Sequence, residues 1–468
     1  YMSSFQESLF SNINKNKNRK AIYIDNKFYT YKEIYLMSLS IIEKLEKNNS
    51  KIIGIFNHKN IFCYISILAT ILSNKVFVPL NPKFSEEKNL HMIKTSGVDT
   101  IVTITKYKFD LNRIQKKLKK KIIILNINNR SLKKQIKMKN KIIKSKVNDT
   151  CYILFTSGSS GYPKGVPIIN KNINSYIHNL NKRYKFSYND RFSNNFEITF
   201  DLFLHDLLLA WTSGACLYIP NSEDYFNISL FIKKHKLTCW FSVPSLAENM
   251  LKGKQLKKNN FPSLKYSAFC GEALPEDILI NWKNSSPNTV IDNLYGPTET
   301  TIAIMGYRWR DKKTLGESMN GIVSIGSIFS GNKIDRSSKR SIFDLLISGN
   351  QVFKGYLDNK QKNVISFKKD KEIYYKTGDL VTVDKMGKYF FLGRKDRQIK
   401  VSGYRVELQE IENQIKQLLK SSQVVVMGWP KTHMNQHSYK SLILFLANVP
   451  KIIHDKEILD YMKNKLSN

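Results

Sequence analysis

Short apolar runs of strand length alternate with segments of helix length through the first part of this chain. A helix is expected over 60–74, and the runs expected to form buried strands are 51–58, 76–82, 100–105 and 121–127. Strands that alternate with helices indicate an α/β fold whose sheets are largely parallel. Because 468 residues exceed what one hydrophobic core usually supports, we expect more than one domain.

A polar and charged stretch at 393–403 precedes an amphipathic helical pattern that starts at Glu407. This change of character predicts a boundary between a large domain at 1–394 and a smaller one at 395–468. Residues 128–148 are rich in lysine and poor in apolar positions. They are predicted to form an exposed connector within the large domain.

The strongest compositional signal is charge, with 75 Lys and Arg against 38 Asp and Glu and a formal net charge of +37. A nucleic-acid partner is one explanation, because clustered cations release counterions from phosphate backbones. The excess is spread along the chain with Asn and Ile, however, and no RNP-type aromatic motif, zinc-finger spacing or helix-turn-helix signature accompanies it. We therefore expect no nucleic-acid partner, whereas acidic proteins should be favoured by electrostatic steering.

Cysteine spacing and hydropathy bear on where the protein works. The five cysteines form no CxxC pair and no disulfide-like framework, which favours a reducing, cytoplasmic setting. The longest apolar stretch, 61–73, is too short to cross a bilayer, and the first ten residues lack the pattern of a signal peptide. The sequence thus predicts a cytoplasmic protein without membrane insertion.

The segment 153–166, ILFTSGSSGYPKGV, changes abruptly from apolar residues to Thr, Ser and Gly. Its glycines free the backbone so that N–H groups can converge on an anion, and its hydroxyls add donors. It is not a Walker loop, because Pro163 precedes Lys164 where that motif has glycine. The pattern predicts a phosphate-binding loop after a buried strand; a flexible Ser/Gly surface loop is the alternative.

Together with later segments, TSGSSGYPKGV resembles the phosphate loop of the adenylate-forming superfamily, which includes acyl-CoA synthetases, luciferases and amino-acid-activating adenylation domains. The later matches, in the order of the family, are NLYGPTETT (293–301), the weaker ISGNQVFKGYL (347–357), YYKTGDLV (374–381) and GRKDRQIKVSGYRVELQEIE (393–412). The resemblance covers nearly the whole chain. It implies a large N-terminal domain with mixed and parallel sheets flanked by helices, and a small mobile α+β C-terminal domain.

The resemblance implies a site for ATP and Mg²⁺. The residues that would cradle the β- and γ-phosphates are Thr156, Ser157, Gly158, Ser159, Ser160, Gly161 and Lys164. Further ATP contacts would come from Gly271, Glu272, Ala273, Asn293 and Gly296. The residues expected to take part in catalysis are Lys164, Thr298, Glu299, Asp379, Arg394 and Asp396.

The implied roles agree with elementary chemistry. Thr298 would touch the α-phosphate and Glu299 would hold Mg²⁺, a hard cation that prefers carboxylate oxygen. Tyr295 would stack on adenine, and Arg394 would support the ribose or a phosphate. Asp379 would accept hydrogen bonds from both ribose hydroxyls, although taken alone it is also an ordinary turn aspartate.

The middle of the chain points to an amino acid as the substrate. The segment FDLFLHDLLLAWTSGACLYIP (200–220) resembles the part of adenylation domains whose aspartate binds the substrate α-ammonium group. Asp201 takes that place and would supply an anion for a cation. An aspartate at the start of a helix is the alternative explanation.

Two further segments, CWFSVPSLAENML (239–251) and FCGEALP (269–275), resemble the D-alanine–carrier-protein ligases. The implied side-chain pocket consists of Leu202, His205, Ser242, Ala268, Cys270, Leu294, Ile302 and Ala303. Phe203, His205 and Leu294 depart from that family's pattern; the imidazole would hydrogen-bond a hydroxyl or carboxylate side chain, or simply pack in the core. The expected substrate is D-alanine first, then L-alanine, serine or another small polar amino acid.

The resemblance also implies a second half-reaction, transfer to the phosphopantetheine thiol of an acidic carrier protein. The C-terminal domain would swing about Asp396, and Lys400, Gly403 and Tyr404 would line the thiol side. The family's C-terminal NGK lysine segment is not found before Asn468; without that lysine we expect strongly impaired adenylation and largely retained ATP binding. A monomer is expected. The alternatives are an acyl- or aryl-CoA ligase and, more remotely, a nucleotide- or nucleic-acid-binding protein without ligase activity.

Overall fold

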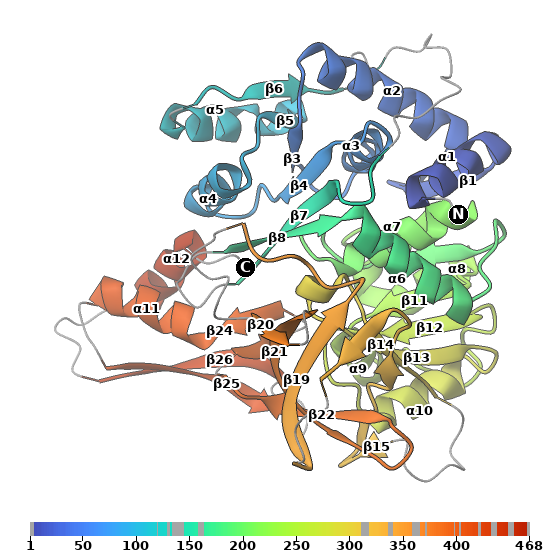
Figure 1. The fold of residues 1–468 in the computed structure, drawn as a ribbon, viewed down its shortest axis with the longest axis vertical. Coiled ribbons are helices and arrows are strands. Elements are labelled where there is room, and N and C mark those ends of the chain that lie inside the picture. Colours follow the sequence, from blue (N-terminus) through green and yellow to red (C-terminus); the bar gives the residue numbers. More distant parts are fainter. Residues whose placement is uncertain are drawn as a thin grey trace.

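The structure is a computed structural model with two large sheets, a smaller antiparallel sheet, a two-stranded sheet and a C-terminal sheet (Figure 1). The residues that it describes are 4–118, 120–128, 132, 145–157, 163–309, 318–335, 340–357, 366–369, 372–396, 398–401, 404–419, 423–431, 438–447 and 454–465.

The largest sheet has nine strands, and the strands in its middle run parallel. In spatial order they are β17 (Ser327–Ile328), β14 (Met305–Arg308), β13 (Val290–Tyr295), β12 (Tyr266–Phe269), β11 (Cys239–Ser242), β9 (Arg191–Ser193), β10 (Cys216–Tyr218), β1 (Lys20–Ile24) and β2 (Lys27–Thr30). Antiparallel partners occur only toward the two edges, at β14, β17 and β2. The parallel strands therefore share one edge at which all their carboxyl ends lie.

The second large sheet has six strands, parallel except for its last pair. In spatial order they are β6 (Ile123–Asn126), β5 (Thr100–Thr103), β3 (Ile52–Phe56), β4 (Val76–Leu80), β7 (Thr150–Thr156) and β8 (Lys164–Ile169). The antiparallel β7–β8 pair brackets the Ser/Gly-rich segment, with Thr156 opposite Lys164.

Helices cover both faces of these sheets. The largest hydrophobic core joins the two sheets and takes in α1 (Phe5–Lys15), α2 (Tyr31–Lys47), α3 (Ile61–Leu72), α6 (Asn170–Arg183) and α7 (Leu202–Ser213). A second core packs the nine-stranded sheet against α8 (Ile228–His235), α9 (Pro244–Lys252) and α10 (Glu276–Ser285). A third packs the six-stranded sheet against α4 (Glu86–Ser96) and α5 (Lys108–Lys117).

Three smaller sheets complete the described chain. The antiparallel one consists of β18 (Asn332–Ile334), β19 (Ile342–Gly349), β20 (Ser366–Lys369), β21 (Glu372–Val383) and β22 (Tyr389–Arg394). A separate two-stranded sheet consists of β15 (Ser318–Met319) and β16 (Ile322–Val323). The C-terminal sheet consists of β23 (Gln398–Val401), β24 (Tyr404–Glu407), β25 (Val424–Lys431) and β26 (Ser438–Leu446), with α11 (Leu408–Leu419) and α12 (Asp455–Lys465) beside it (Figure 1).

The fold confirms the predicted α/β class with its largely parallel sheets. The four predicted strands appear as β3, β4, β5 and β6, and the predicted helix as α3. The connector at 128–148 lies mostly outside the described residues. Arg394 ends β22 and Gln398 begins β23 in a different sheet; the division into domains 1–394 and 395–468 stays a prediction.

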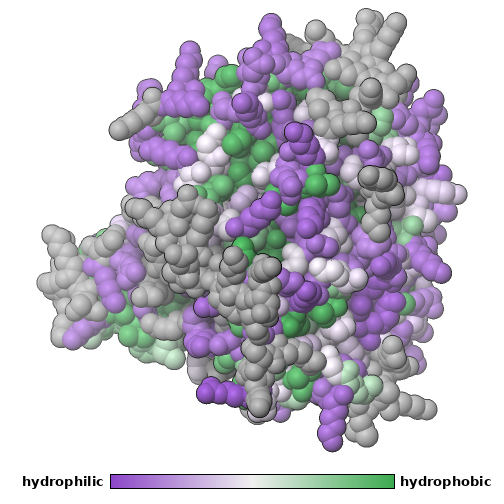
Figure 2. Space-filling view, in the orientation of Figure 1, coloured by the Kyte–Doolittle hydropathy of each residue, from purple (hydrophilic) through white to green (hydrophobic). Residues whose placement is uncertain are grey.

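Among the described residues no helix has the length and apolar character needed to cross a bilayer. On the face shown in Figure 2, hydrophilic side chains cover most of the described surface, with smaller hydrophobic areas between them.

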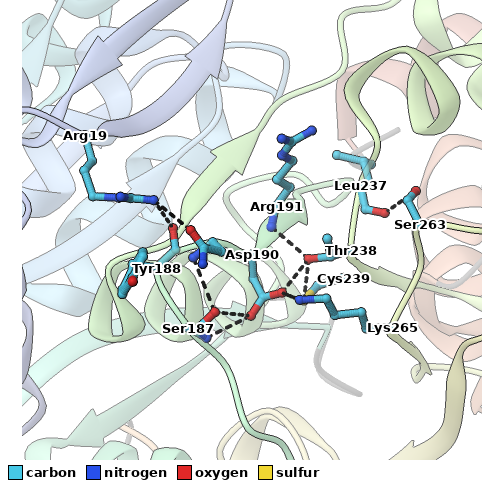
Figure 3. A network of polar contacts seen from close by, with 11 residues as sticks. Arg19, Ser187, Tyr188, Asp190, Arg191, Leu237, Thr238, Cys239, Ser263 and Lys265 are labelled. Carbon is cyan, nitrogen blue, oxygen red and sulfur yellow. Dashed lines mark hydrogen bonds and ion pairs between the residues drawn. The ribbon is translucent and has the colours of Figure 1, made fainter.

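A polar network closes the amino ends of three parallel strands (Figure 3). The buried Asp190 carboxylate accepts hydrogen bonds from the Ser187 backbone N–H at 2.8 Å and the Thr238 hydroxyl at 2.9 Å, and pairs with Lys265 Nζ at 3.0 Å. These donors sit just before β9, β11 and β12. The network therefore connects the amino ends of β9, β11 and β12.

Candidate functional site at the carboxyl ends of the strands

Most of the predicted substrate residues lie at or after the carboxyl ends of parallel strands in the nine-stranded sheet, whereas Lys164 begins β8 and Asp379 and Arg394 lie on β21 and β22. Ser242 ends β11, Cys270 follows β12, and Tyr295 ends β13. In open sheets of this kind ligands bind outside the carboxyl ends of the strands. The fold therefore brings most of the predicted substrate residues and the segment 295–299 to one edge of this sheet.

A series of polar contacts links three predicted nucleotide residues to Asp396, the predicted hinge residue. Arg394 Nη1 donates to Asp379 Oδ1 at 2.6 Å, and Arg394 Nε and Nη2 both donate to Asp396 at 2.7 Å. The Tyr295 hydroxyl donates a short hydrogen bond to the other oxygen of Asp379. Asp379 and Arg394 side chains are nearly buried, whereas that of Asp396 is 46% exposed.

The backbone next to Asp379 holds this residue in a fixed position within the series of contacts. Gly378 has φ +78°, and a Cβ there would lie 2.6 Å from Arg394 Nη2, so glycine is required for both conformation and space. The Thr377 hydroxyl accepts a hydrogen bond from the Asp379 N–H at 3.0 Å. Burial and the neighbouring Asp379 carboxylate raise the pKa of Tyr295 well above its usual value, so its hydroxyl stays protonated and remains a donor.

A second chain of contacts links the predicted phosphate lysine to the predicted metal ligand. The ammonium of Lys164 lies 5.5 Å from the ring centroid of Tyr356, and the Tyr356 hydroxyl donates to Glu299 Oε1 at 2.5 Å. Glu299 and Thr298 belong to one short turn, Thr298–Thr300, immediately after β13. The predicted phosphate and metal ligands are thus linked through one side chain, although they are 135 positions apart in sequence.

The described donor set fits Mg²⁺ as ATP-dependent enzymes hold it. Mg²⁺ usually keeps several waters and takes one or two carboxylates plus substrate phosphates, rather than a cage of protein ligands. Glu299 supplies one carboxylate beside a threonine hydroxyl and a lysine. Among the described residues no cluster of three or more His, Cys, Asp or Glu could hold a metal by itself.

The predicted substrate pocket comes together as one buried cluster. The pocket residues that belong to the largest hydrophobic core are Leu202, Ala268, Cys270, Leu294, Ile302 and Ala303. Gly271, with φ +90°, would place a Cβ 3.2 Å from Leu202 Cδ1. Segments that lie up to 100 residues apart therefore form one apolar wall.

His205 lies in this wall with a fixed orientation. Its ring stacks on Phe241 with a centroid distance of 3.9 Å, and its Nδ1 lies 2.5 Å from the Tyr176 hydroxyl. Burial lowers the pKa of His205 to about 3, so the imidazole is neutral at physiological pH. A neutral ring can hydrogen-bond a substrate but cannot balance a negative charge.

Asp201 immediately precedes α7 and is 7% exposed. Burial first, and the Asp201 carboxylate second, raise the pKa of Tyr152 well above its usual value. The Asp201 side chain makes no capping hydrogen bond to α7. Its position at the start of α7 is the one that the alternative expects, and its contact with the substrate α-ammonium group stays a prediction.

The remaining predicted ATP residues make contacts of different kinds. Asn293 donates its amide to the carbonyls of Val323 and Ser324, and Glu272 accepts from the Ser245 N–H at the start of α9. Gly296 is packed so closely that a Cβ would lie 2.7 Å from Ala303 Cα. Thr156 and Ser157 are partly buried where β7 ends, and Ala273 lies beside Glu272.

Some predicted residues cannot be placed. Gly158, Ser159, Ser160, Gly161 and Gly403 lie outside the described residues, as do the side chains of Lys400 and Tyr404. Ser242, which is fully buried, accepts a hydrogen bond from Trp240 Nε1 at 3.0 Å.

The structure also adds residues that the sequence analysis did not single out. Tyr356 contacts two charged groups of the site, Tyr176 holds His205, and Gln351 donates to the Ala303 carbonyl at 2.8 Å. Two of them lie in the weaker segment 347–357, whose tyrosine follows a glycine. That position in a recognisable segment was the only signal that could have pointed to them.

Comparison with known proteins agrees with this geometry. Residues 9–357 match the family described as AMP-binding enzyme. A D-alanine–D-alanyl carrier protein ligase of Lactococcus lactis is 28% identical over 424 residues, covering 89% of this chain and 82% of the relative. The corresponding ligase of Staphylococcus haemolyticus is 27% identical over 456 residues, covering 96% and 89%.

Among solved structures, the Vibrio cholerae adenylation domain AlmE in complex with glycyl-adenosine-5′-phosphate has a TM-score of 0.88 and 26% identity. The match covers 100% of this chain and 93% of that one. The chain belongs to the AMP-binding enzyme family and has the fold of its adenylation domains. As a member it is an AMP-forming ligase that uses ATP, which confirms the superfamily suggested by the sequence motifs.

Proposed function

We propose that this protein activates a small amino acid as an aminoacyl-AMP, with release of pyrophosphate, and then passes it to the phosphopantetheine thiol of a carrier protein. The observation that carries the proposal is the two series of contacts that join predicted nucleotide residues, Asp379 with Arg394 and, through Tyr356, Lys164 with Glu299. Asp379, Arg394, Lys164 and Glu299 form the nucleotide side, and Asp201 begins the helix that carries the pocket wall.

On the nucleotide side, each charged group has a task that its surroundings favour. Asp379 accepts from the ribose hydroxyls, and Arg394 pairs with its carboxylate at 2.6 Å. Lys164 offsets the charge of the pyrophosphate that leaves, which stabilises the separating anion. When bound at Glu299, Mg²⁺ would neutralise phosphate charge during the attack of the carboxylate on the α-phosphate.

On the substrate side, the chemistry favours a small, uncharged side chain. Asp201 would pair with the α-ammonium group, and the apolar residues predicted to form the pocket would surround the side chain. The neutral imidazole of His205 disfavours an acidic side chain, which would be buried without a counter-charge. D-alanine is the first choice, since the curated relatives are D-alanine ligases; glycine, L-alanine and serine also meet these requirements.

The proposed partner is an acidic carrier protein. The similar ligases are carrier protein ligases, and a net charge of +37 would accelerate association with an acidic surface. We further propose that the enzyme works as a monomer in the cytoplasm. None of the five cysteines, all of which are described, forms a disulfide, as expected in a reducing compartment.

Pyrophosphate exchange into ATP, measured across D- and L-amino acids and short fatty acids, tests the proposal. Exchange should be fastest with one small amino acid and weak with acidic or large ones. Exchange with fatty or aryl acids alone would instead make the protein an acyl- or aryl-CoA ligase. A failure to bind ATP would leave it a protein without ligase activity.

A further inference from the structure

Tyr356 lies between the two oppositely charged groups of the phosphate side. Its hydroxyl donates to Glu299 Oε1 at 2.5 Å, while the Lys164 ammonium lies 5.5 Å from the centroid of its ring. A phenol is a strong donor to a carboxylate, and the face of an aromatic ring attracts a cation. A single side chain thus gives each charge a contact of its own.

The backbone on both sides of Tyr356 is fixed to the same two segments. The Phe353 N–H donates to the Glu299 carbonyl at 2.9 Å, and the Leu357 N–H donates to the Gly165 carbonyl at 3.0 Å. The ring of Phe353 packs edge-on against that of Tyr356, with centroids 5.0 Å apart. Tyr356 is 5% exposed.

The close fit at Gly165 reinforces this attachment. A Cβ on Gly165 would lie 2.8 Å from Leu357 Cδ1, so the strand that carries Lys164 packs directly against the segment that carries Tyr356. A side chain fixed by its neighbours can hold other groups in place at little entropic cost. The position of Tyr356 is therefore set before any ligand arrives.

We propose that Tyr356 is a positioning residue that orients Glu299 toward a divalent cation and Lys164 toward the departing phosphates. The inference rests on the proposed function, because it takes these two groups to be the metal and phosphate ligands. The Tyr356 hydroxyl would orient the Glu299 carboxylate, and the Tyr356 ring would orient the Lys164 ammonium. Two substitutions therefore separate the two effects: Tyr356→Phe removes only the hydroxyl, and Tyr356→Leu removes the ring as well.

The experiment is calorimetric titration with α,β-methylene-ATP, first in EDTA and then at rising Mg²⁺, with no amino acid present. Tyr356→Phe should raise the Mg²⁺ concentration at half-maximal enhancement about tenfold, the effect of one charge-assisted hydrogen bond. Its affinity in EDTA should stay within about twofold of wild type. Tyr356→Leu should in addition lose affinity in EDTA by about fivefold, because the cation–π contact is gone.

Tyr31→Phe is the matched control. Tyr31 is fully buried in the first core and its hydroxyl donates to the Ala215 carbonyl at 2.6 Å, so its loss has a comparable effect on folding. It should leave both titrations unchanged. If Tyr356→Phe behaves like Tyr31→Phe, or weakens binding equally with and without Mg²⁺, the inference is wrong while the proposed function stands. If the wild-type protein binds no nucleotide, both are wrong.

Discussion

The two ends of the parallel strands in the nine-stranded sheet use buried aspartates in different ways. At the amino ends, Asp190 takes its donors from residues just before β9, β11 and β12, so the contacts hold one sheet together. At the carboxyl ends, Asp379 on β21 takes donors from Tyr295 on β13 and Arg394 on β22, so its contacts join two different sheets. The first arrangement stabilises a layer, whereas the second assembles a site from separate layers.

The Asp190 and Asp379 carboxylates are expected to have different roles. The Asp190 carboxylate is surrounded by donors of its own sheet in an arrangement that needs no ligand. Asp379 pairs with Arg394, which also donates to Asp396. Asp396 lies close to where the chain enters the C-terminal sheet. Substitutions at the two aspartates should therefore affect different properties.

The largest effect is expected for Asp379→Asn. Loss of the charge would weaken the two charge-assisted hydrogen bonds that Asp379 is proposed to accept from a ribose, so ATP binding should become about 100-fold weaker. The free energy of unfolding should change less than for the substitution at Asp190, because asparagine keeps an oxygen acceptor for Arg394 and Arg394 keeps Asp396. Calorimetric ATP titration and urea unfolding measure the two quantities; an unchanged ATP affinity would contradict the assignment.

Asp190→Asn should show the opposite pattern. The amide would present a donor where the Ser187 N–H and hydroxyl already donate, leaving buried polar groups unsatisfied. We expect a loss of about 2 kcal/mol in the free energy of unfolding, with most of it due to those buried donors, since the Lys265 side chain is half-exposed. ATP affinity should stay within about twofold; a large change in affinity would mean that the two ends are coupled.

The smallest effect concerns the pH dependence contributed by His205. Because burial lowers its pKa to about 3 in the folded protein, the unfolded chain binds a proton more readily, and stability falls as the pH drops below about 6.5. This group should contribute a loss of about 1.5 kcal/mol between about pH 6.5 and pH 5. Urea unfolding at several pH values should show that loss in wild type and not in His205→Gln; parallel curves would contradict a buried, neutral imidazole.

The fold was largely predictable because it depends on patterns within short segments. The apolar runs that became β3, β4 and β5 are buried by the same alternation with helices that predicted them, whereas β6 lies at the edge of its sheet and is partly exposed. The order of the strands was not predictable. It depends on packing between segments far apart in sequence, as in β1 between β10 and β2.

The same distinction applies to the site. Motifs named Asp379, Glu299 and Lys164 because these residues are local features of recognisable segments. The contacts that involve these residues could not be predicted from the sequence. Tyr356 donates to Glu299, which lies 57 positions away, and Tyr295 donates to Asp379 across 84 positions. The predicted stacking of Tyr295 on adenine and the hinge role of Asp396 stay predictions. What the structure adds is that both side chains contact the Asp379–Arg394 pair.

Hydrogen–deuterium exchange with and without ATP, Mg²⁺ and alanine tests the central claim most directly, that the chemistry lies at the carboxyl ends of the strands. Bound ligands should slow exchange in the segments that contain Asp201, Glu299, Tyr356 and Asp379. Exchange around Asp190 and Lys265, at the amino ends, should not change. Protection confined to the amino ends, or none at the carboxyl ends while ligand is bound, would contradict the account.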